Sequence, residues 1–77
     1  MTVHVEFMGP VKRPTPEPQA EVTLPDGGTI EDLLLALGYQ PMHVRHIGVF
    51  RGDVRLPRGS RLADGDRVVL TLPLGGG

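Results

Sequence analysis

The chain has 77 residues, a formal net charge of −1 at pH 7 and no cysteine. This length suits a single domain, and the lack of cysteine excludes disulfide bonds, thiol chemistry and cysteine-ligated zinc or iron–sulfur sites. Because the aromatic residues are one tyrosine and two phenylalanines, the core must be built largely from aliphatic side chains.

The N-terminal segment MTVHVEF lacks the basic stretch and the apolar run of a secretory signal. The longest apolar run, residues 33–37, is far too short to span a membrane. We therefore expect a soluble, cytoplasmic protein that has no membrane partner.

Charge is distributed unevenly along the chain. Residues 1–40 carry two basic and six acidic residues, whereas residues 41–77 carry six arginines and three aspartates. The C-terminal half is therefore the better candidate for contact with an acidic partner. A solvated surface explains the same asymmetry equally well.

Residues 2–24 predict two strands joined by a proline-rich connection. Apolar and polar residues alternate in 2–8 and again in 20–24, as is typical of half-buried strands. Residues 9–19 contain four prolines, which favour an extended loop. We expect the strands to pair in antiparallel fashion. Their inward-facing side chains should be Val3, Val5, Phe7, Ala20, Val22 and Leu24.

Residues 29–38 predict a helix of about two turns. Thr29 is a good N-cap, Asp32 occupies the position of a capping-box acid, and Gly38 suits the position after the C-cap. The stripe that would pack on a sheet consists of Ile30, Leu33, Leu34 and Leu37.

The remaining sequence predicts three strands and no second helix. We expect a connector over residues 39–45 and strands at 46–50, 53–57 and 67–72, with a glycine turn at Asp64–Asp66. One helix can cover only one face of the sheet. The predicted fold class is α+β, a mixed sheet of four to five strands with one main helix packed on one face.

This arrangement leaves apolar residues on an uncovered face. Ile47 and Val49 point to one side of their strand and Phe50 to the other, because side chains alternate along a strand. Either Phe50 or the pair Ile47 and Val49 should be exposed, beside Val69 and Thr71. Such a patch predicts a surface for docking a partner protein, unless the proline-rich loop covers it.

Other chemistries have weaker support. His4, His43 and His46 lack the spacing and neighbouring carboxylates of a metal site, so we expect no metal. Ser60 has no GxSxG context. An anion site at Gly27–Gly28 would be opposed by the surrounding acids, which favour a simple turn and helix cap. The arginines of the C-terminal half lack interleaved aromatics, so nucleic acid is not an expected partner.

The chain ends in PLGGG. Glycine is costly to order, so a glycine tail is expected to stay flexible until something binds it. A terminal carboxylate on a residue without a Cβ can enter a narrow channel in another protein. If that protein adenylates it with ATP, the carboxylate becomes reactive toward sulfur or nitrogen. A tail without function is the alternative.

Several segments in order carry a resemblance to a known family. The start VHVEF, the segment LPDGGTIEDLLLAL and the run LADGDRVVLTLPLGGG resemble the ThiS/MoaD family of sulfur carriers, which have the ubiquitin-like β-grasp fold. The similarity spans nearly the whole chain. It implies a β-grasp domain over residues 1–72 and a flexible tail over residues 73–77.

The resemblance also implies a function. An E1-like adenylating enzyme would consume ATP to activate the carboxylate of Gly77, with Gly75 and Gly76 threaded into that partner. A sulfur donor would then form a thiocarboxylate, and the sulfur would pass to a biosynthetic enzyme making thiamin thiazole or molybdopterin. The chain would be a substrate with no catalytic residues and no bound cofactor.

The sequence departs from the family at two places. Arg51–Gly52 stands where members often have Asn-Gly, and the stretch 13–18 is unusually rich in proline. These departures leave the client pathway open. Two alternatives to the sulfur carrier remain: a β-grasp interaction module with an inert tail, and a ubiquitin-like modifier conjugated through Gly77.

Overall fold

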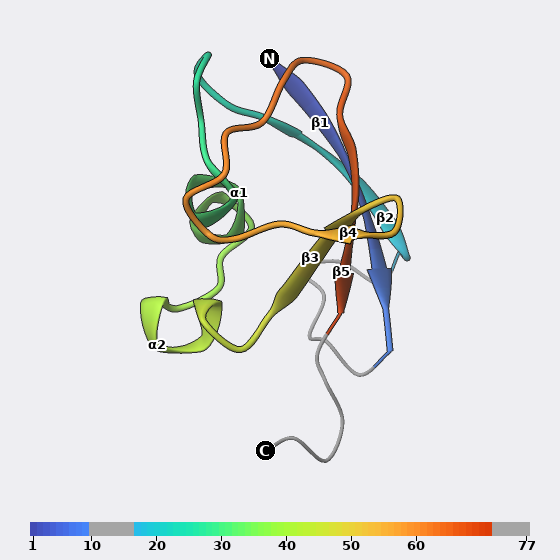
Figure 1. The fold of residues 1–77 in the computed structure, drawn as a ribbon, viewed down its shortest axis with the longest axis vertical. Coiled ribbons are helices and arrows are strands. Elements are labelled where there is room, and N and C mark those ends of the chain that lie inside the picture. Colours follow the sequence, from blue (N-terminus) through green and yellow to red (C-terminus); the bar gives the residue numbers. More distant parts are fainter. Residues whose placement is uncertain (10–16, 72–77) are drawn as a thin grey trace.

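The computed structural model describes residues 1–9 and 17–71 (Figure 1). Within these ranges, five strands form one sheet, and no helix is both long and apolar enough to cross a membrane. The elements in chain order are β1 (Thr2–Met8), β2 (Gln19–Thr23), α1 (Ile30–Ala36), α2 (Pro41–Val44), β3 (Gly48–Arg51), β4 (Val54–Arg55) and β5 (Arg67–Thr71).

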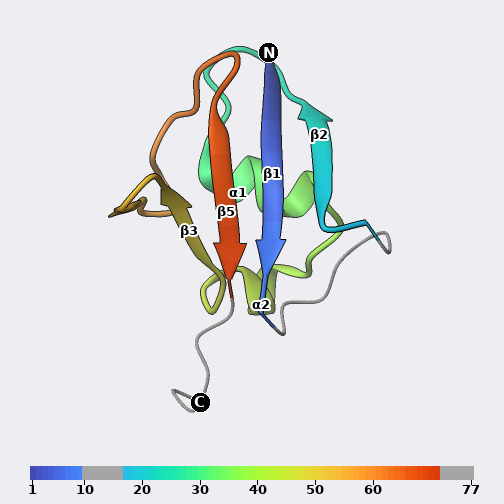
Figure 2. The same cartoon turned by 90° about the vertical axis from the view of Figure 1, so that its right-hand side faces the viewer.

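The sheet is mixed, and its strand order is β2-β1-β5-β3-β4. The central pair, β1 and β5, is parallel, and every other neighbouring pair is antiparallel. Both helices lie on one side of this sheet (Figures 1 and 2). The structure therefore confirms the predicted α+β class, with one main helix on one face of a mixed sheet.

The core lies between the sheet and α1. The alternation in β1 places Val3, Val5 and Phe7 on the covered side, as predicted, and all three are buried. On β2, Ala20 and Val22 are half-buried against the same core. The other buried residues of the core are Leu24, Ile30, Leu33, Leu34, Val44, Ile47, Val49, Leu62, Val68 and Leu70.

Local signals in the sequence define both ends of α1. The hydroxyl of Thr29 accepts a hydrogen bond from the amide of Asp32 at 3.2 Å, and the Asp32 carboxylate accepts one from the Thr29 amide at 2.9 Å. This reciprocal pair is the predicted capping box. At the other end, Gly38 has φ +97°, a conformation that glycine adopts without strain. Leu37, the last residue of the predicted stripe, is half-buried.

The short helix α2 was not predicted. Its residues were assigned to a connector, because one turn of helix is too short to show a 3.6-residue period. Pro41 begins it, at a position where a missing amide hydrogen costs nothing. Val44 inserts into the core and holds α2 beneath α1.

Strands β3 and β4 are shorter than predicted. The predicted strand 46–50 begins only at Gly48, because the amides of His46 and Ile47 donate to carbonyls of α2 at 3.0 and 3.2 Å. The predicted strand 53–57 is reduced to Val54–Arg55 at the edge of the sheet. The main consequence is that the end of α2 leads directly into β3.

The turn before β5 is tied to the start of β1. Asp64 accepts a hydrogen bond from the amide of Thr2 at 2.7 Å. The carboxylate of Asp66 accepts from the amide of Ala63 at 2.8 Å and from the guanidinium of Arg51 at 3.2 Å. These bonds link β1, β3 and β5 at one end of the sheet. They are made by the predicted glycine turn, in which Gly65 has φ +84°.

The packing of α1 predicts unequal costs for two leucines of the same helix. Leu33 is fully buried, whereas Leu35 is 43% exposed. Leu33→Ala should lower the free energy of unfolding by about 2–5 kcal/mol, because it leaves a cavity between helix and sheet. Leu35→Ala should change it by about 0.5 kcal/mol or less. Urea denaturation measures both values, and equal losses would contradict this description of the core.

Candidate functional site

The side of the sheet opposite α1 carries the candidate site, and we call it the open face. Figure 2 looks onto this face, with the helices behind the strands. Strand register determines which side chains share it. Val69 of β5 pairs with Glu6 of β1 and with Phe50 of β3, so these three side chains form one row across the sheet.

The structure decides which side of residues 46–50 is open. Ile47 is 7% exposed and Val49 is 1% exposed, so both belong to the core rather than to a docking surface. Val49 pairs with the buried Leu70 on the covered side of the sheet. Phe50 lies on the open face and is only partly buried. Of the two alternatives from the sequence, exposure of Phe50 is therefore correct.

Four side chains form an apolar patch on the open face: Met8, Phe50, Val69 and Thr71. Met8 is 53% exposed and pairs with Thr71 across the β1–β5 ladder. Gly48 leaves space within the patch, since a Cβ built on it would lie 3.3 Å from the Phe50 ring and 3.5 Å from the Thr71 methyl group. The ring therefore lies along its own strand, over Gly48.

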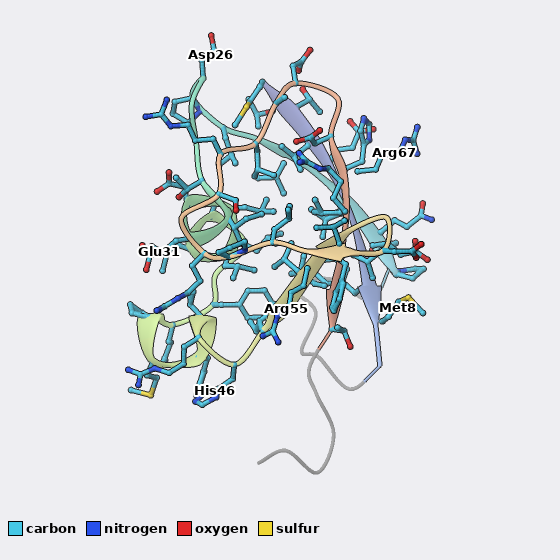
Figure 3. The ribbon with its side chains drawn as sticks, in the orientation of Figure 1. Met8, Asp26, Glu31, His46, Arg55 and Arg67 are labelled. Carbon is cyan, nitrogen blue, oxygen red and sulfur yellow. The ribbon has the colours of Figure 1, made fainter. Side chains whose placement is uncertain are left out.

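A shallow hollow with ionisable side chains in its lining adjoins the apolar patch. It has a volume of about 480 Å³ and is lined mainly by β1, β2 and β5. Its ionisable side chains include His4, Glu21 and Arg67, and the imidazole Nδ1 of His4 lies 3.6 Å from a carboxylate oxygen of Glu21. Met8 and Arg67 both project from the side of the sheet away from α1 (Figure 3). The apolar patch thus has a charged border, as protein contact surfaces commonly do.

The predicted tail residues Gly75, Gly76 and Gly77 lie outside the described residues, as does Leu72. The structure does place the base of the tail. Strand β5 ends at Thr71, which belongs to the apolar patch and lies between Met8 and Gly48 in the register. The predicted reactive terminus is therefore attached six residues beyond the patch.

The start of α1 does not offer an anion site. The amides of Ile30 and Glu31 donate to the carbonyls of Ser60 and Arg58, each at 3.0 Å. The amide of Asp32 is bonded to Thr29. Because these amides already have partners, the turn-and-cap interpretation of Gly27–Gly28 is supported.

The histidines are dispersed. His43 is on α2, His46 follows that helix, and His4 is on β1 across the sheet. Among the described residues, no group of three or more histidines and acids is arranged to hold a metal ion.

Comparison with known proteins rests on structure, since no family model and no curated protein sequence matches the chain. SAMP1 from Haloferax volcanii has a TM-score of 0.76 and 24% identity, with 100% of each chain covered. A chain from the complex of subunits 1 and 2 of molybdopterin-converting factor from Helicobacter pylori 26695 has a TM-score of 0.65 and 23% identity, again over 100% of each chain. The chain has a ThiS/MoaD-like β-grasp fold. The predicted fold is thereby confirmed.

Sequence reasoning did not identify every residue of this β-grasp surface. Met8 was missed, although it continues the alternation of β1 two residues beyond Glu6. Gly48 and Arg67 were missed because their roles depend on the pairing of β5 with β3 and β1. That pairing joins segments that are far apart in the sequence, so no local sequence pattern predicts it.

The position of Phe50 over Gly48 can be tested with one methyl group. Gly48→Ala places a Cβ against the ring and should shift the NMR signals of Phe50 and Thr71. Gly59→Ala is a matched control, since nothing lies within 4 Å of its added Cβ. The free energy of unfolding of the Gly59→Ala control should rise by about 0.4–1 kcal/mol, because alanine lowers the conformational entropy of the unfolded chain. Gly48→Ala should be less stable than this control, and unchanged Phe50 signals would contradict the described packing.

Proposed function

We propose that this protein is a cytoplasmic sulfur carrier whose C-terminal glycine, Gly77, is activated by an E1-like adenylating enzyme. The observation that carries the proposal is the apolar patch at the base of the glycine tail, on a β-grasp fold. A partner that binds the patch would hold Thr71 and direct the six following residues toward its own active site. The fold of molybdopterin-converting factor, which the chain shares, supports the same conclusion.

The proposed chemistry belongs to the terminal carboxylate. One of its oxygens attacks the α-phosphorus of ATP, and pyrophosphate leaves, which gives an acyl-adenylate. Hydrosulfide, the simplest sulfur donor, then attacks the carbonyl carbon. The bond from carbon to the phosphate oxygen breaks, AMP departs and a thiocarboxylate remains. Gly75 and Gly76 allow close approach, because no Cβ meets the walls of the channel.

A second partner would accept the sulfur. The solved molybdopterin-converting factor is a complex of two subunits. By analogy, we propose that this chain binds a biosynthetic enzyme through the same patch and tail. Molybdopterin synthesis is the favoured client on this comparison, and thiamin thiazole synthesis is the alternative. The chain itself would act as a substrate, with ATP consumed by the activating enzyme.

Intact-protein mass spectrometry tests the role of Gly77. After incubation with ATP, sulfide and an E1-like enzyme from the same cell, the mass should increase by the difference between sulfur and oxygen. Fragmentation should place the change on Gly77. Deletion of Gly76 and Gly77 should abolish the change and leave the circular dichroism spectrum intact.

A one-residue extension provides the matched control. Adding alanine after Gly77 keeps every native residue but moves the carboxylate onto a residue with a Cβ. This variant should not gain sulfur. Sulfur incorporation into the deletion variant would refute the proposal, and an unmodified wild-type terminus would favour an interaction module with an inert tail.

The apolar patch predicts a second, separable effect. Phe50→Ala removes the largest side chain of the patch and should raise the KM of the carrier for the activating enzyme about tenfold or more, since aromatic side chains at interface centres dominate binding. Leu35→Ala removes a partly exposed leucine from the opposite side of the molecule and should leave KM unchanged. Equal KM values for the two variants would exclude the patch as the docking surface.

The likeness to SAMP1, which is a ubiquitin-like protein, favours a second candidate function. In this alternative, the acyl group of Gly77 passes to an amine of another protein rather than to sulfur. Activation is the same in both cases, and only the nucleophile differs. A covalent adduct through an isopeptide bond, in place of a thiocarboxylate, would identify this function.

A further inference from the structure

A group of basic side chains lies on α2 and the turn that follows it. We call His43, Arg45 and His46, together with Met42 among them, the basic collar. All four residues are exposed, and Met42 is 62% exposed, the highest value among the large apolar residues of the described chain. Methionine and arginine are both enriched in protein contact surfaces, whose rims are polar.

The basic collar is adjacent to the place where the chain leaves the sheet. His46 precedes Gly48 by two residues, and Gly48 pairs with Thr71, the last residue of β5. Figures 1 and 2 show α2 at the same end of the molecule as the end of β5. Figure 3 shows His46 at that end as well. The collar therefore lies near the point where the tail begins, within reach of an enzyme that binds this end of the domain.

Acidic residues are absent from the stretch of sequence around the collar. Residues 33–52 contain two arginines and two histidines but no aspartate or glutamate. Glu17, at the same end of the sheet, precedes β2, which is separated from β5 by β1. Glu31, in the first turn of α1, lies well apart from His46 (Figure 3). Among the residues that the structure describes, Arg45 takes part in no salt bridge, so its positive charge remains available to a partner.

We propose that the basic collar docks against an acidic rim around the entrance of the channel that receives the tail. This inference rests on the proposed function and specifies the partner surface: carboxylates facing Arg45 and the two histidines, around an apolar depression for Met42. Carboxylates suit these groups because guanidinium and imidazole N–H groups donate hydrogen bonds to them. The collar would thus orient the domain, while the apolar patch supplies buried contact area.

Nucleic acid is a poorer fit for the same residues. One arginine and two histidines neutralise few phosphates, and nonspecific binding to nucleic acid depends on many such contacts. A protein rim needs only a few carboxylates opposite the collar, together with a place for Met42. The observations therefore favour an acidic protein surface.

The inference can be tested with the full chain and an E1-like enzyme from the same cell. Steady-state adenylation is measured as ATP–pyrophosphate exchange. Arg45→Gln should raise the KM for the carrier at least about threefold and leave kcat within about twofold, because charges at an interface rim act on association. The KM of the wild type should rise with salt, and that of Arg45→Gln should rise less steeply. Met42→Ala and the double variant His43→Gln/His46→Gln should raise KM in the same direction.

Arg58→Gln is the matched control. Arg58 is an exposed arginine in the loop whose carbonyl contacts the start of α1, away from the collar. The Arg58→Gln variant loses the same charge as Arg45→Gln but should keep the wild-type KM and the wild-type salt dependence. If Arg45→Gln and Arg58→Gln behave alike while exchange proceeds, the collar inference is wrong and the proposed function stands. If the wild type supports no exchange, both are wrong.

Discussion

The parallel pairing of β1 with β5 is the constraint on which the rest of the structure depends. It joins the start of the chain to its last described strand, and both strands lie at the centre of the sheet. Its register places Val68 and Leu70 against the core and Val69 and Thr71 on the open face. Hydrogen bonds between the turn at Asp64–Asp66 and the start of β1 hold this register at one end. A shift by one residue would exchange the two faces of β5 and bury the base of the tail.

The covered face explains why the other face is available. Because α1 and α2 both lie on one side of the sheet, the buried residues form a single core between the helices and the sheet. The fold therefore does not require a second layer on the opposite face. Apolar side chains on the open face therefore contribute little to the core. Val69, Phe50 and Met8 nevertheless stand there, in register, next to the last residue of β5. A surface of this kind is better explained by binding than by folding.

The sequence predicted features that depend on near neighbours. The alternation in β1, the capping box of Thr29 and Asp32, and the terminating Gly38 are local signals, and the structure confirms each. It did not predict α2, because a single turn has no measurable period. It left open which side of residues 46–50 is exposed, because both sides carry apolar residues and only the pairing of Val49 with Leu70 decides between them. The excess of arginine after residue 40 indicated a basic surface in this half of the chain. The position of the collar beside Thr71 depends on tertiary structure and could not be predicted.

The apolar patch and the basic collar would contribute to binding through different physical effects. Burial of apolar area acts at short range and chiefly slows dissociation, whereas charges at a rim act at longer range and mainly affect encounter and orientation. A carrier of the kind proposed would have to be captured and oriented, and then released to a second enzyme. Moderate apolar area combined with a few charges suits this cycle better than a large apolar interface, because obligate interfaces of that kind dissociate slowly. Both surfaces adjoin the end of β5, so a partner bound to either one would lie close to the point where the tail begins.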